Sequence, residues 1–319
     1  MHAARRVLQH AATTPQCRRF SKFAFVGAGK MAEAMLAPLQ ETTIEGATPS
    51  VSFYDVSCAV AKRVAEKYPQ LTRAESLDEC VDGADVVVLC TKPQNCDAVF
   101  ADLRPVVQAQ STPPVLLSIL AGVPMETFRA GLGLQKVARA MPNTPGQIGC
   151  GVTVWTAGDH KELFTDADIE RCKGALGALG KEIYVEEESY VDMSTSISGS
   201  GPAYIFLLIE AMVDAGVQEG FSREVATTLV HQTILGSVKY AMESGEHPAV
   251  LKNSVTSPAG TTASAIYELE KGNFRTVVQD AIWACYRRSL EMGGLDSNVG
   301  PGRSAGPKPT TEFPDMNGN

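Results

Sequence analysis

The chain contains 319 residues, of which 44% are hydrophobic and 20% are charged, a composition typical of a soluble globular protein with room for two domains. Its formal net charge of -8 argues against a nucleic-acid-binding surface. The eight cysteines form no C-x-x-C pair and the five histidines show no metal-ligand spacing, so the sequence predicts neither a zinc site nor a disulfide framework. Small-molecule chemistry without a metal is the favoured class of function.

Residues 1–20 have the composition of a mitochondrial transit peptide. They contain four arginines but no Asp or Glu, and residues 3–12 can form a short basic amphipathic helix. The run Arg18-Arg19-Phe20-Ser21 also resembles a matrix-processing site. We therefore expect a mitochondrial protein; the alternative is a cytoplasmic protein whose first residues are disordered.

A glycine-rich loop follows the first predicted strand, Lys22–Val26. The loop reads G-x-G-x-x-A and leads into a predicted helix, which is the context that a dinucleotide fingerprint requires. Gly27 permits the tight turn, Gly29 lets the backbone approach a pyrophosphate, and the small Ala32 lets helix and strand pack closely. We expect the cofactor to contact Gly27, Ala28, Gly29, Lys30 and Met31.

The second predicted strand, Val51–Tyr54, ends at Asp55, where a Rossmann acidic residue meets the adenosine ribose. A carboxylate at this position favours NADH because it repels a 2'-phosphate. The choice stays open, since Ser57, Lys62 and Arg63 follow closely and can accommodate that phosphate. Asp55 can also be an ordinary turn residue at a strand end.

Two apolar runs are predicted to be strands that helices cover on both faces. Asp85–Cys90 ends just before Lys92, and Val115–Leu120 ends just before Ala121 and Gly122. Ligands bind at the carboxyl ends of parallel strands, so Lys92 can reach the cofactor, although a solvated loop lysine is an equal alternative. The small residues after the second run suit a nicotinamide lying close to the backbone.

Three more predicted strands, Lys136–Ala140, Val152–Thr156 and Glu182–Val185, complete a sheet of roughly eight strands. The loop Met141–Pro145 between the first two encloses a polar pair between two prolines. Residues 21–188 are thus predicted to form an α/β domain with a Rossmann-type doubly wound sheet and a few extra strands at its far edge.

Residues 189–292 are predicted to form an all-α domain after an acidic, solvated hinge at Glu186–Glu188. Within it, Tyr204–Ile209 is too short to span a bilayer and is expected to be a buried helix. Apolar residues at helical spacing predict a core face, formed by Val277, Ala281, Ile282 and Cys285. An apolar helical domain often completes its core against a second copy, so we expect at least a homodimer. Residues 293–319 are expected to be a disordered tail.

The stretch Asn253–Leu269 is the predicted substrate seat. Ser257 is expected to cap a helix that has Pro258 in its first turn, and Gly260, Thr261 and Thr262 come just ahead of the apolar face. Free backbone N–H groups, the positive end of the helix dipole and the hydroxyls would bind a small carboxylate. An ordinary capped helix is the alternative.

Six segments, in order and at their spacing, resemble pyrroline-5-carboxylate reductases. They read G-A-G-K-M-A-E-A, T-K-P, A-G-V, A-M-P-N-T-P, S-G-S-G-P-A-Y and L-K-N-S-V-T-S-P-A-G-T-T. The resemblance covers about residues 23–292, and its last segment is highly specific. It implies a Rossmann domain followed by an all-α dimerisation domain, and NAD(P)H-dependent reduction of 1-pyrroline-5-carboxylate to L-proline, the last step of proline biosynthesis.

The resemblance also implies roles for individual residues. The implied cofactor positions are Gly27 to Met31 with Thr91, Lys92, Pro93 and Ala121. The implied substrate carboxylate site consists of Ser257, Gly260, Thr261 and Thr262, with Glu188 near it. Thr262 is the candidate catalytic residue, since its hydroxyl can hydrogen-bond the carboxylate or the ring nitrogen. No obligatory acid is expected, because a protonated cyclic imine is already electrophilic at carbon.

Two residues depart from the family pattern, and two other classes of protein are alternatives. Ala259 stands where the family often has glycine, and Asp55 stands where NADPH-using members often carry a small polar residue. A 3-hydroxyacid dehydrogenase of the 6-phosphogluconate dehydrogenase type shares the domain order, but its catalytic lysine is missing after Gly201. A dinucleotide-binding regulator without catalysis would keep the glycine loop but would not need the seat.

Overall fold

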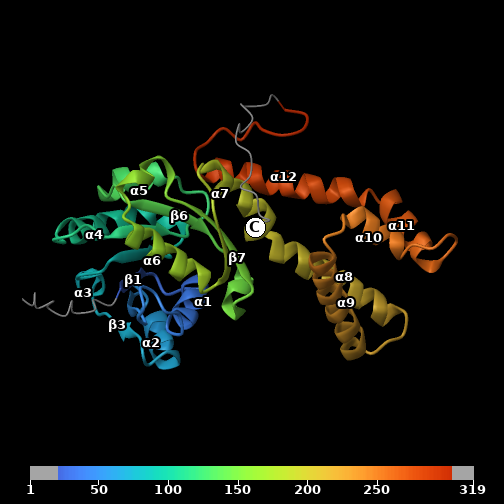
Figure 1. The fold of residues 1–319 in the computed structure, drawn as a ribbon, viewed down its shortest axis with the longest axis horizontal. Helices are drawn as coiled ribbons and strands as arrows, with labels where there is room; N and C mark the ends of the chain where they lie inside the picture. Colours follow the sequence, from blue (N-terminus) through green and yellow to red (C-terminus); the bar gives the residue numbers. More distant parts are fainter. Residues whose placement is uncertain (1–20, 304–319) are drawn as a thin grey trace, which may run out of the picture.

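The computed structural model describes residues 21–303, so the predicted transit peptide and the final part of the predicted tail lie outside the described range. Figure 1 shows two parts, an α/β domain built around one sheet and an arm of helices that projects from it. The division follows the change from strand-rich to helical sequence.

One sheet of eight strands forms the centre of the α/β domain in the described chain, in the order β3-β2-β1-β4-β5-β6-β7-β8. The strands are β1 Lys22–Val26, β2 Ser50–Tyr54, β3 Thr72–Arg73, β4 Val86–Leu89, β5 Val115–Ser118, β6 Val137–Met141, β7 Gly151–Thr156 and β8 Gly180–Tyr184. All neighbouring strands are parallel except β6 and β7. The prediction of a doubly wound sheet with extra strands at its far edge is confirmed, although the short β3 was not among the predicted strands.

Helices cover both faces of the sheet. Residues of α1 (Lys30–Leu39), α2 (Cys58–Lys67) and α6 (Asp166–Gly177) share one hydrophobic cluster with the sheet. Residues of α3 (Leu77–Val81), α4 (Cys96–Gln108) and α5 (Met125–Leu132) share a second cluster. Every residue of β4 is buried, as expected for a parallel strand with helices on both sides.

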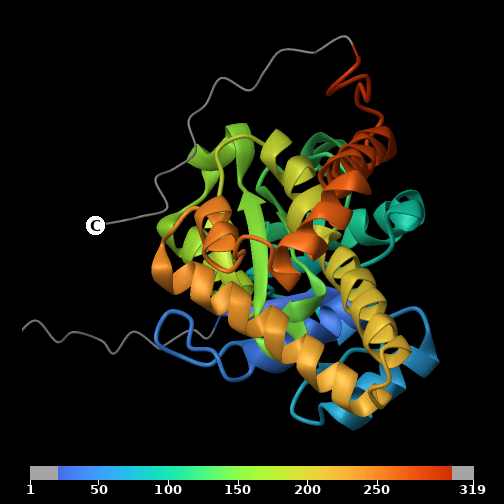
Figure 2. The same ribbon diagram turned by 90° about the vertical axis from the view of Figure 1, so that its right-hand side faces the viewer.

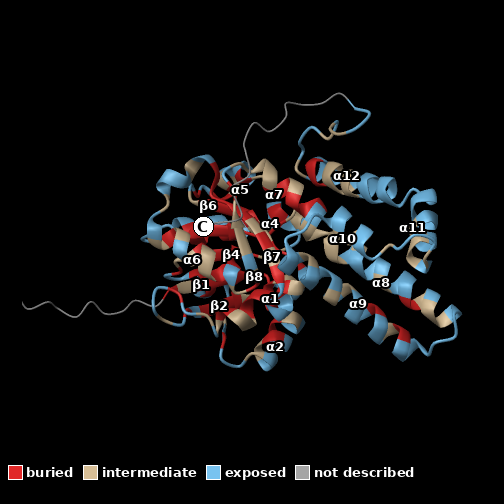
Figure 3. Ribbon diagram, turned by 45° about the vertical axis from the view of Figure 1, so that its right-hand side comes forward, coloured by how far each residue is buried: buried red, intermediate tan, exposed pale blue. Residues whose placement is uncertain are grey.

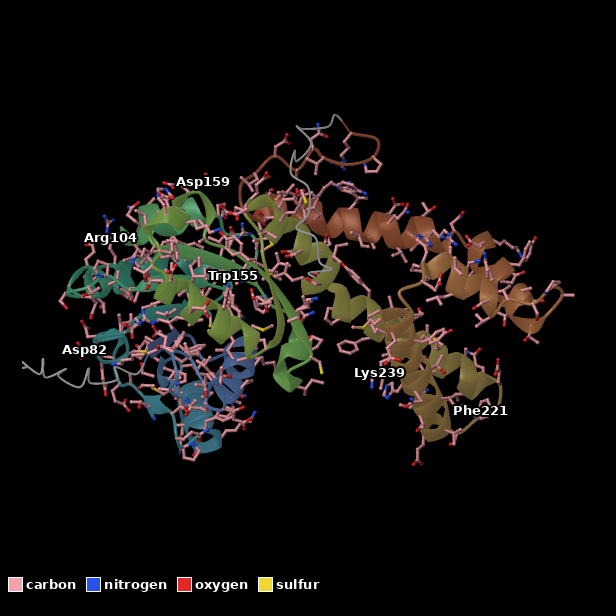
Figure 4. The ribbon with its side chains drawn as sticks, in the orientation of Figure 1. Asp82, Arg104, Trp155, Asp159, Phe221 and Lys239 are labelled. Atoms are coloured by element: carbon pink, nitrogen blue, oxygen red, sulfur yellow. The ribbon has the colours of Figure 1, made fainter. Side chains whose placement is uncertain are left out.

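The arm consists of helices joined by short turns. These are α7 Ser189–Ser194, a π-helical turn Thr195–Gly199, α8 Gly201–Gln218, α9 Arg223–Ser244, α10 Pro248–Ser254, α11 Thr261–Lys271 and α12 Phe274–Met292. Helices α8 and α9 form a hairpin, seen from a second side in Figure 2, and Phe221 lies at its tip in Figure 4. Figure 3 shows buried residues concentrated in the sheet, whereas most of the arm is exposed.

Two predictions about burial in the arm are wrong for the single chain. Tyr204–Ile209 was expected to be a buried helix, yet Phe206 is 60% exposed and Leu207 is 66% exposed. Val277, from the predicted core face of α12, is 61% exposed. The helical periodicity is present, but among the described residues the cluster between α8 and α9 is small and is formed by Val213, Ala226 and Val230.

The start of the predicted tail is ordered against α12. The N–H of Leu295 donates to the carbonyl of Leu290 at 2.9 Å, and Arg287 Nη1 donates to the carbonyl of Val299 at 3.3 Å. Residues 293–303 therefore differ from the predicted disordered tail, because α12 supplies acceptors and donors that a local composition rule does not consider.

Candidate active site

The predicted cofactor residues meet at one edge of the sheet. In the parallel register, Val26 pairs with both Tyr54 and Leu89, and Leu89 pairs with Ser118. The loops after β1, β2, β4 and β5 therefore leave the sheet side by side at their carboxyl ends, where ligands bind in open α/β folds. These loops contain Gly27 to Met31, Asp55, Thr91 to Pro93, and Ala121.

Positions 27 and 29 of the first loop require glycine for different structural reasons. Gly27 has φ +94°, its N–H donates to the carbonyl of Tyr54 at 2.8 Å, and a Cβ there would lie 3.0 Å from the carbonyl of Cys90. A Cβ on Gly29 would meet no atom within 4 Å, so the space beside it is open to a ligand. The loop thus fits a dinucleotide, since Gly27 is needed for the turn and Gly29 leaves room for close approach.

Helix α1 begins directly after this loop and offers free backbone donors. Gly29 is its N-cap and makes no side-chain capping hydrogen bond, and the first helical bond runs from the N–H of Glu33 to the carbonyl of Gly29. The N–H groups of the residues between them have no acceptor within the helix. This arrangement, with the positive end of the helix dipole, is suited to a pyrophosphate.

Asp55 holds the glycine loop in place. Its Oδ2 accepts the N–H of Ala28 at 2.8 Å and its Oδ1 accepts the N–H of Ser57, also at 2.8 Å. Each carboxylate oxygen keeps a further lone pair, so a ribose hydroxyl can still donate to it. Asp55 is thus more than a turn residue at a strand end, since it joins the loops after β1 and β2.

The cations that could bind a 2'-phosphate are partly engaged elsewhere. Arg63 Nη2 lies 2.5 Å from Glu33 Oε1, and Lys67 Nζ lies 3.2 Å from Glu33 Oε2. Lys62 is 73% exposed and lies 3.9 Å from Glu66. Of the three residues that the sequence suggests for binding a 2'-phosphate, Ser57 and Lys62 are the more available, because Arg63 already pairs with Glu33 of α1.

The loops after β4 and β5 complete this edge. A Cβ on Gly27 would lie 3.2 Å from Thr91 Cγ2, so the T-K-P segment packs against the glycine loop. Thr91 Oγ1 is buried and has no hydrogen-bond partner among the described residues. Lys92 is exposed, and Pro93 opens a short 3-10 helix. Ala121 directly precedes Gly122, whose φ of +71° turns the chain sharply at the sheet edge.

The substrate seat lies at the start of α11, but its helix begins later than predicted. Gly260 is the N-cap of α11, whereas Ser257 was expected to be the cap. Ser257 instead opens a turn in which the N–H of Gly260 donates to its carbonyl at 3.1 Å. Ala259 adopts φ +56°, a left-handed conformation in which the family's frequent glycine has no strain. The local cap rule failed because the turn at Pro258 and Ala259 delays the start of the helix until Thr261.

The start of α11 leaves backbone donors of the seat free. Gly260 makes no side-chain capping bond, and the first helical bond is from the N–H of Ser264 to the carbonyl of Gly260 at 3.3 Å. The N–H groups of Thr261, Thr262 and Ala263 therefore have no acceptor within α11. A Cβ on Gly260 would collide with Ser257 Oγ, which places this hydroxyl at the helix start. Backbone donors and hydroxyls thus converge as a carboxylate site requires.

Comparisons with known proteins agree with this geometry. A family model described as pyrroline-5-carboxylate reductase dimerisation matches residues 188–292, and one described as NADP oxidoreductase, coenzyme F420-dependent, matches residues 22–122. The pyrroline-5-carboxylate reductase of Pisum sativum is 36% identical over 84% of this chain and 94% of its own. The chain belongs to the pyrroline-5-carboxylate reductase family.

Further members of the family show the same likeness. The enzyme of Pseudomonas aeruginosa is 37% identical over 85% of this chain and 96% of its own. A structure of the Plasmodium falciparum enzyme, with NADP bound, superposes with a TM-score of 0.74 at 29% identity, covering 86% of this chain and 98% of that one. The Coxiella burnetii enzyme gives 0.74 at 31% identity, over 86% and 99% of the two chains. The predicted Rossmann domain, helical dimerisation domain and NAD(P)H cofactor are confirmed.

The family's dimerisation domain explains the exposed apolar face. A groove of about 800 Å³ runs between the loop after β6 and the helices α8 and α12, and its lining includes Asn143, Pro145, Tyr204, Phe206, Phe274 and Val277. The helical stretch 189–218 is by length and composition apolar enough to cross a membrane, and 11% of the residues in its apolar 18-residue window are buried. In a domain that dimerises, a second copy is the partner that covers such a face.

The two halves of the site do not meet within one chain. Figures 1 and 3 show α11 at the outer end of the arm, far from the sheet edge before α1. Glu188, expected near the seat, lies beside the sheet of its own chain, where its Oε1 accepts hydrogen bonds from the Met125 N–H and from Arg139 Nη1, each at 2.8 Å. Ser257, Gly260, Thr261 and Thr262 are brought together, and the cofactor residues are brought together elsewhere.

Sequence reasoning missed two groups of residues. Asn143 joins the domains, because its Nδ2 donates to the carbonyl of Ser198 at 3.0 Å and its Oδ1 accepts Val152 N–H at 3.1 Å. The two prolines around Asn143 were a visible signal of a fixed loop. Arg139 and Asp192 form a buried ion pair that only the tertiary fold reveals. Among residues 21–303, no group of three His, Cys, Asp or Glu side chains could hold a metal ion.

Proposed function

We propose that this protein reduces the C=N bond of 1-pyrroline-5-carboxylate to give L-proline, with NAD(P)H as the hydride donor. The observation that carries the proposal is the N-terminus of α11, where Gly260 leaves the N–H groups of Thr261 and Thr262 free beside Ser257 Oγ. A carboxylate of a small cyclic imine matches this set of donors. Membership of the family supplies the reaction that the seat serves.

The residues of this chain act mainly by binding and orientation. The bound nicotinamide supplies the hydride. Gly27, Gly29 and Asp55 hold the dinucleotide at the carboxyl edge of the sheet, while the α11 seat binds the substrate carboxylate and so aims the imine carbon. The Thr262 hydroxyl can hold the carboxylate or the ring nitrogen, and no side chain has to protonate an imine that is already cationic.

We further propose that each complete site uses two copies of the chain. Within one protomer, the seat lies at the outer end of the arm and the cofactor edge lies in the α/β domain. The apolar groove beside α8 and α12 offers the surface on which the copies join. A seat from one protomer would then face the cofactor edge of its partner.

Mixed dimers test both parts of this proposal. Co-expression of a Thr262→Ala chain with a Gly29→Leu chain places an intact seat and an intact cofactor loop on different chains. If the site is shared, random pairing restores about a quarter of wild-type NAD(P)H oxidation, since half of the dimers carry one complete site. If each chain holds its own site, the mixture stays as inactive as the separate variants. Absence of turnover in the wild type would reject the reaction itself.

We propose a mitochondrial location, supported by the basic, acid-free composition of residues 1–20. Fusion of residues 1–25 to a fluorescent protein should direct it to mitochondria, and sequencing of the mature protein should find an N-terminus near Ser21. A fusion in which the four arginines of residues 1–20 are replaced by glutamine should stay in the cytoplasm. Cytoplasmic fluorescence of the unaltered fusion would contradict the proposal.

A further inference from the structure

A buried ionic cluster lies where the helical arm meets the α/β domain. Arg139 on β6 is 1% exposed, and its Nη2 lies 2.6 Å from Asp192 Oδ1 while its Nη1 lies 3.0 Å from Asp192 Oδ2. Asp192 on α7 is 2% exposed and also accepts the Ser289 hydroxyl of α12 at 3.0 Å. One carboxylate thus ties a strand of the sheet to two helices of the arm.

The same end of α12 packs closely on the expected nicotinamide loop. A Cβ on Gly122 would lie 2.8 Å from Met292 Cβ and 3.1 Å from the Ser289 carbonyl. A Cβ on Gly293 would lie 2.6 Å from the Gly122 carbonyl. There is consequently no free space between the C-terminus of α12 and the turn after Ala121, so a shift of one moves the other.

The opposite end of α12 adjoins the C-terminus of α11, the helix whose N-terminus forms the substrate seat. Helix α11 ends one short turn before α12, and Asn273 in that turn has φ +56°. The Arg275 guanidinium of α12 lies 2.8 Å from Glu270 of α11, which fixes the turn between them. Helix α12, with 19 residues, is therefore a rod about 28 Å long with the ionic cluster at one end and the last turn of α11 at the other, and the first turn of α11 carries the seat.

From these contacts, and resting on the proposed function, we propose that Arg139, Asp192 and Ser289 form a joint that sets the direction of α12. The joint acts as a positioning device, because it fixes the angle between the arm and its own α/β domain, and in the shared site this angle sets how far the seat of one protomer lies from the cofactor edge of its partner. A small rotation at the joint is amplified along the rod, whereas the donors of the seat are unchanged. Misplacement of about 1 Å far from the chemistry can cost about a hundredfold in rate.

The ion pair between Arg139 and Asp192 is better suited to fixing the direction of α12 than to raising the stability of the fold. A buried ion pair gains little net stability over well-packed apolar residues, since both charges lose their hydration. Its directional bonds do fix geometry, because the planar guanidinium meets the carboxylate through two parallel hydrogen bonds. Burial alone would lower the pKa of Arg139, but the hydrogen bonds and charges of Asp192 and Glu188 outweigh it and raise this pKa, so the guanidinium stays charged.

Ser289→Ala removes the link between the joint and α12, and Ser52→Ala is a matched control. Ser52 is also buried and donates to the Cys80 carbonyl at 2.7 Å, but this bond lies within the α/β domain. We expect Ser289→Ala to lower kcat about tenfold with little change in substrate KM or dinucleotide Kd. Ser52→Ala should change kcat less than about twofold. Asp192→Asn, which keeps the side-chain size, should lower kcat further.

Hydrogen exchange separates failure of the joint from failure of the proposed reaction. In Ser289→Ala, amides of residues 286–293 and 119–123 should exchange at least about tenfold faster than in Ser52→Ala, whether or not the enzyme turns over. Equal exchange in the two variants would overturn the joint even if the wild type reduces the imine. The positioning role would likewise be overturned if Ser289→Ala and Ser52→Ala lowered kcat equally. It would also be overturned if Ser289→Ala raised substrate KM and left kcat unchanged. If Asp192→Asn does not fold, the comparison of Ser289→Ala with Ser52→Ala tests the joint by itself.

Discussion

The carboxylate of Asp55 accepts the backbone N–H of Ala28 at 2.8 Å, and this bond joins the end of β2 to the glycine loop after β1. We propose a second role for the same carboxylate, because an acidic residue at the end of the second Rossmann strand meets the adenosine ribose. A second bond, from the N–H of Ser57 to Oδ1, fixes the rotamer of Asp55. In this proposal, cofactor preference and loop geometry are linked through the side chain of Asp55.

Asp55→Asn is expected to shift the cofactor preference towards NADPH. The amide oxygen can still accept one of the two backbone N–H groups, so the loop is largely kept, while the negative charge that repels a 2'-phosphate is lost. We expect the ratio of kcat/KM for NADPH to that for NADH to rise about tenfold. Steady-state kinetics with each cofactor measure the ratio. An unchanged ratio would show that the carboxylate does not face the adenosine ribose.

Gly260→Ala is expected to weaken substrate binding. An added Cβ would collide with Ser257 Oγ and displace this hydroxyl from the start of α11. Substrate KM should rise at least about tenfold while dinucleotide affinity is unchanged, because the cofactor loops lie in the other domain. Gly177→Ala in α6 is the control, since a Cβ there meets no atom within 4 Å. The idea fails if both variants bind substrate like the wild type.

Phe206→Asp on α8 is expected to separate the copies of the chain. Phe206 is 60% exposed in the single chain and lines the apolar groove, so a buried charge there would oppose association. Sedimentation velocity should show monomers that still bind the dinucleotide but have lost turnover. Leu163→Asp, at an apolar residue 41% exposed on the α/β domain, should leave the oligomer intact. Dimers of Phe206→Asp with full activity would place the interface elsewhere.

Asp168 should make the stability of the α/β domain depend on pH below about 4. Burial alone would raise its pKa, but the Lys136 ammonium at 2.7 Å and the N–H of Thr165 outweigh it and lower the pKa below 3.8. A lowered carboxyl pKa gives stability that is present above the unfolded pKa and is lost as pH falls through the folded pKa.

Asp168→Asn should therefore cost about 2 kcal/mol in the free energy of unfolding at neutral pH. The difference between wild type and variant should shrink as the pH is lowered below the unfolded pKa, as measured by urea unfolding at a series of pH values. Asp166→Asn, in the same helical turn but exposed, is the control and should change stability little. A difference that stays constant with pH would show that the charge of Asp168 is not what stabilises the fold.

The sequence by itself determined the features that depend on neighbours along the chain. Apolar runs such as Asp85–Cys90 predicted buried parallel strands, and the spacing of Gly27, Gly29 and Ala32 predicted the tight turn between β1 and α1. Helical periodicity likewise predicted the helices of the arm. These patterns are local, because strand alternation, turn sterics and helix pitch act over a few residues.

The tertiary structure alone decided what those elements contact. Periodicity marks an apolar face but does not say whether this chain or a second copy covers it, so the burial of Tyr204–Ile209 was predicted wrongly. The helix start near Ser257 depended on a turn with Ala259 at φ +56°, which the capping rule does not include. The pairing of Arg139 with Asp192, 53 residues apart, arises from packing between domains. Such long-range contacts leave no periodic trace in the sequence, since their energy depends on shape and charge in three dimensions.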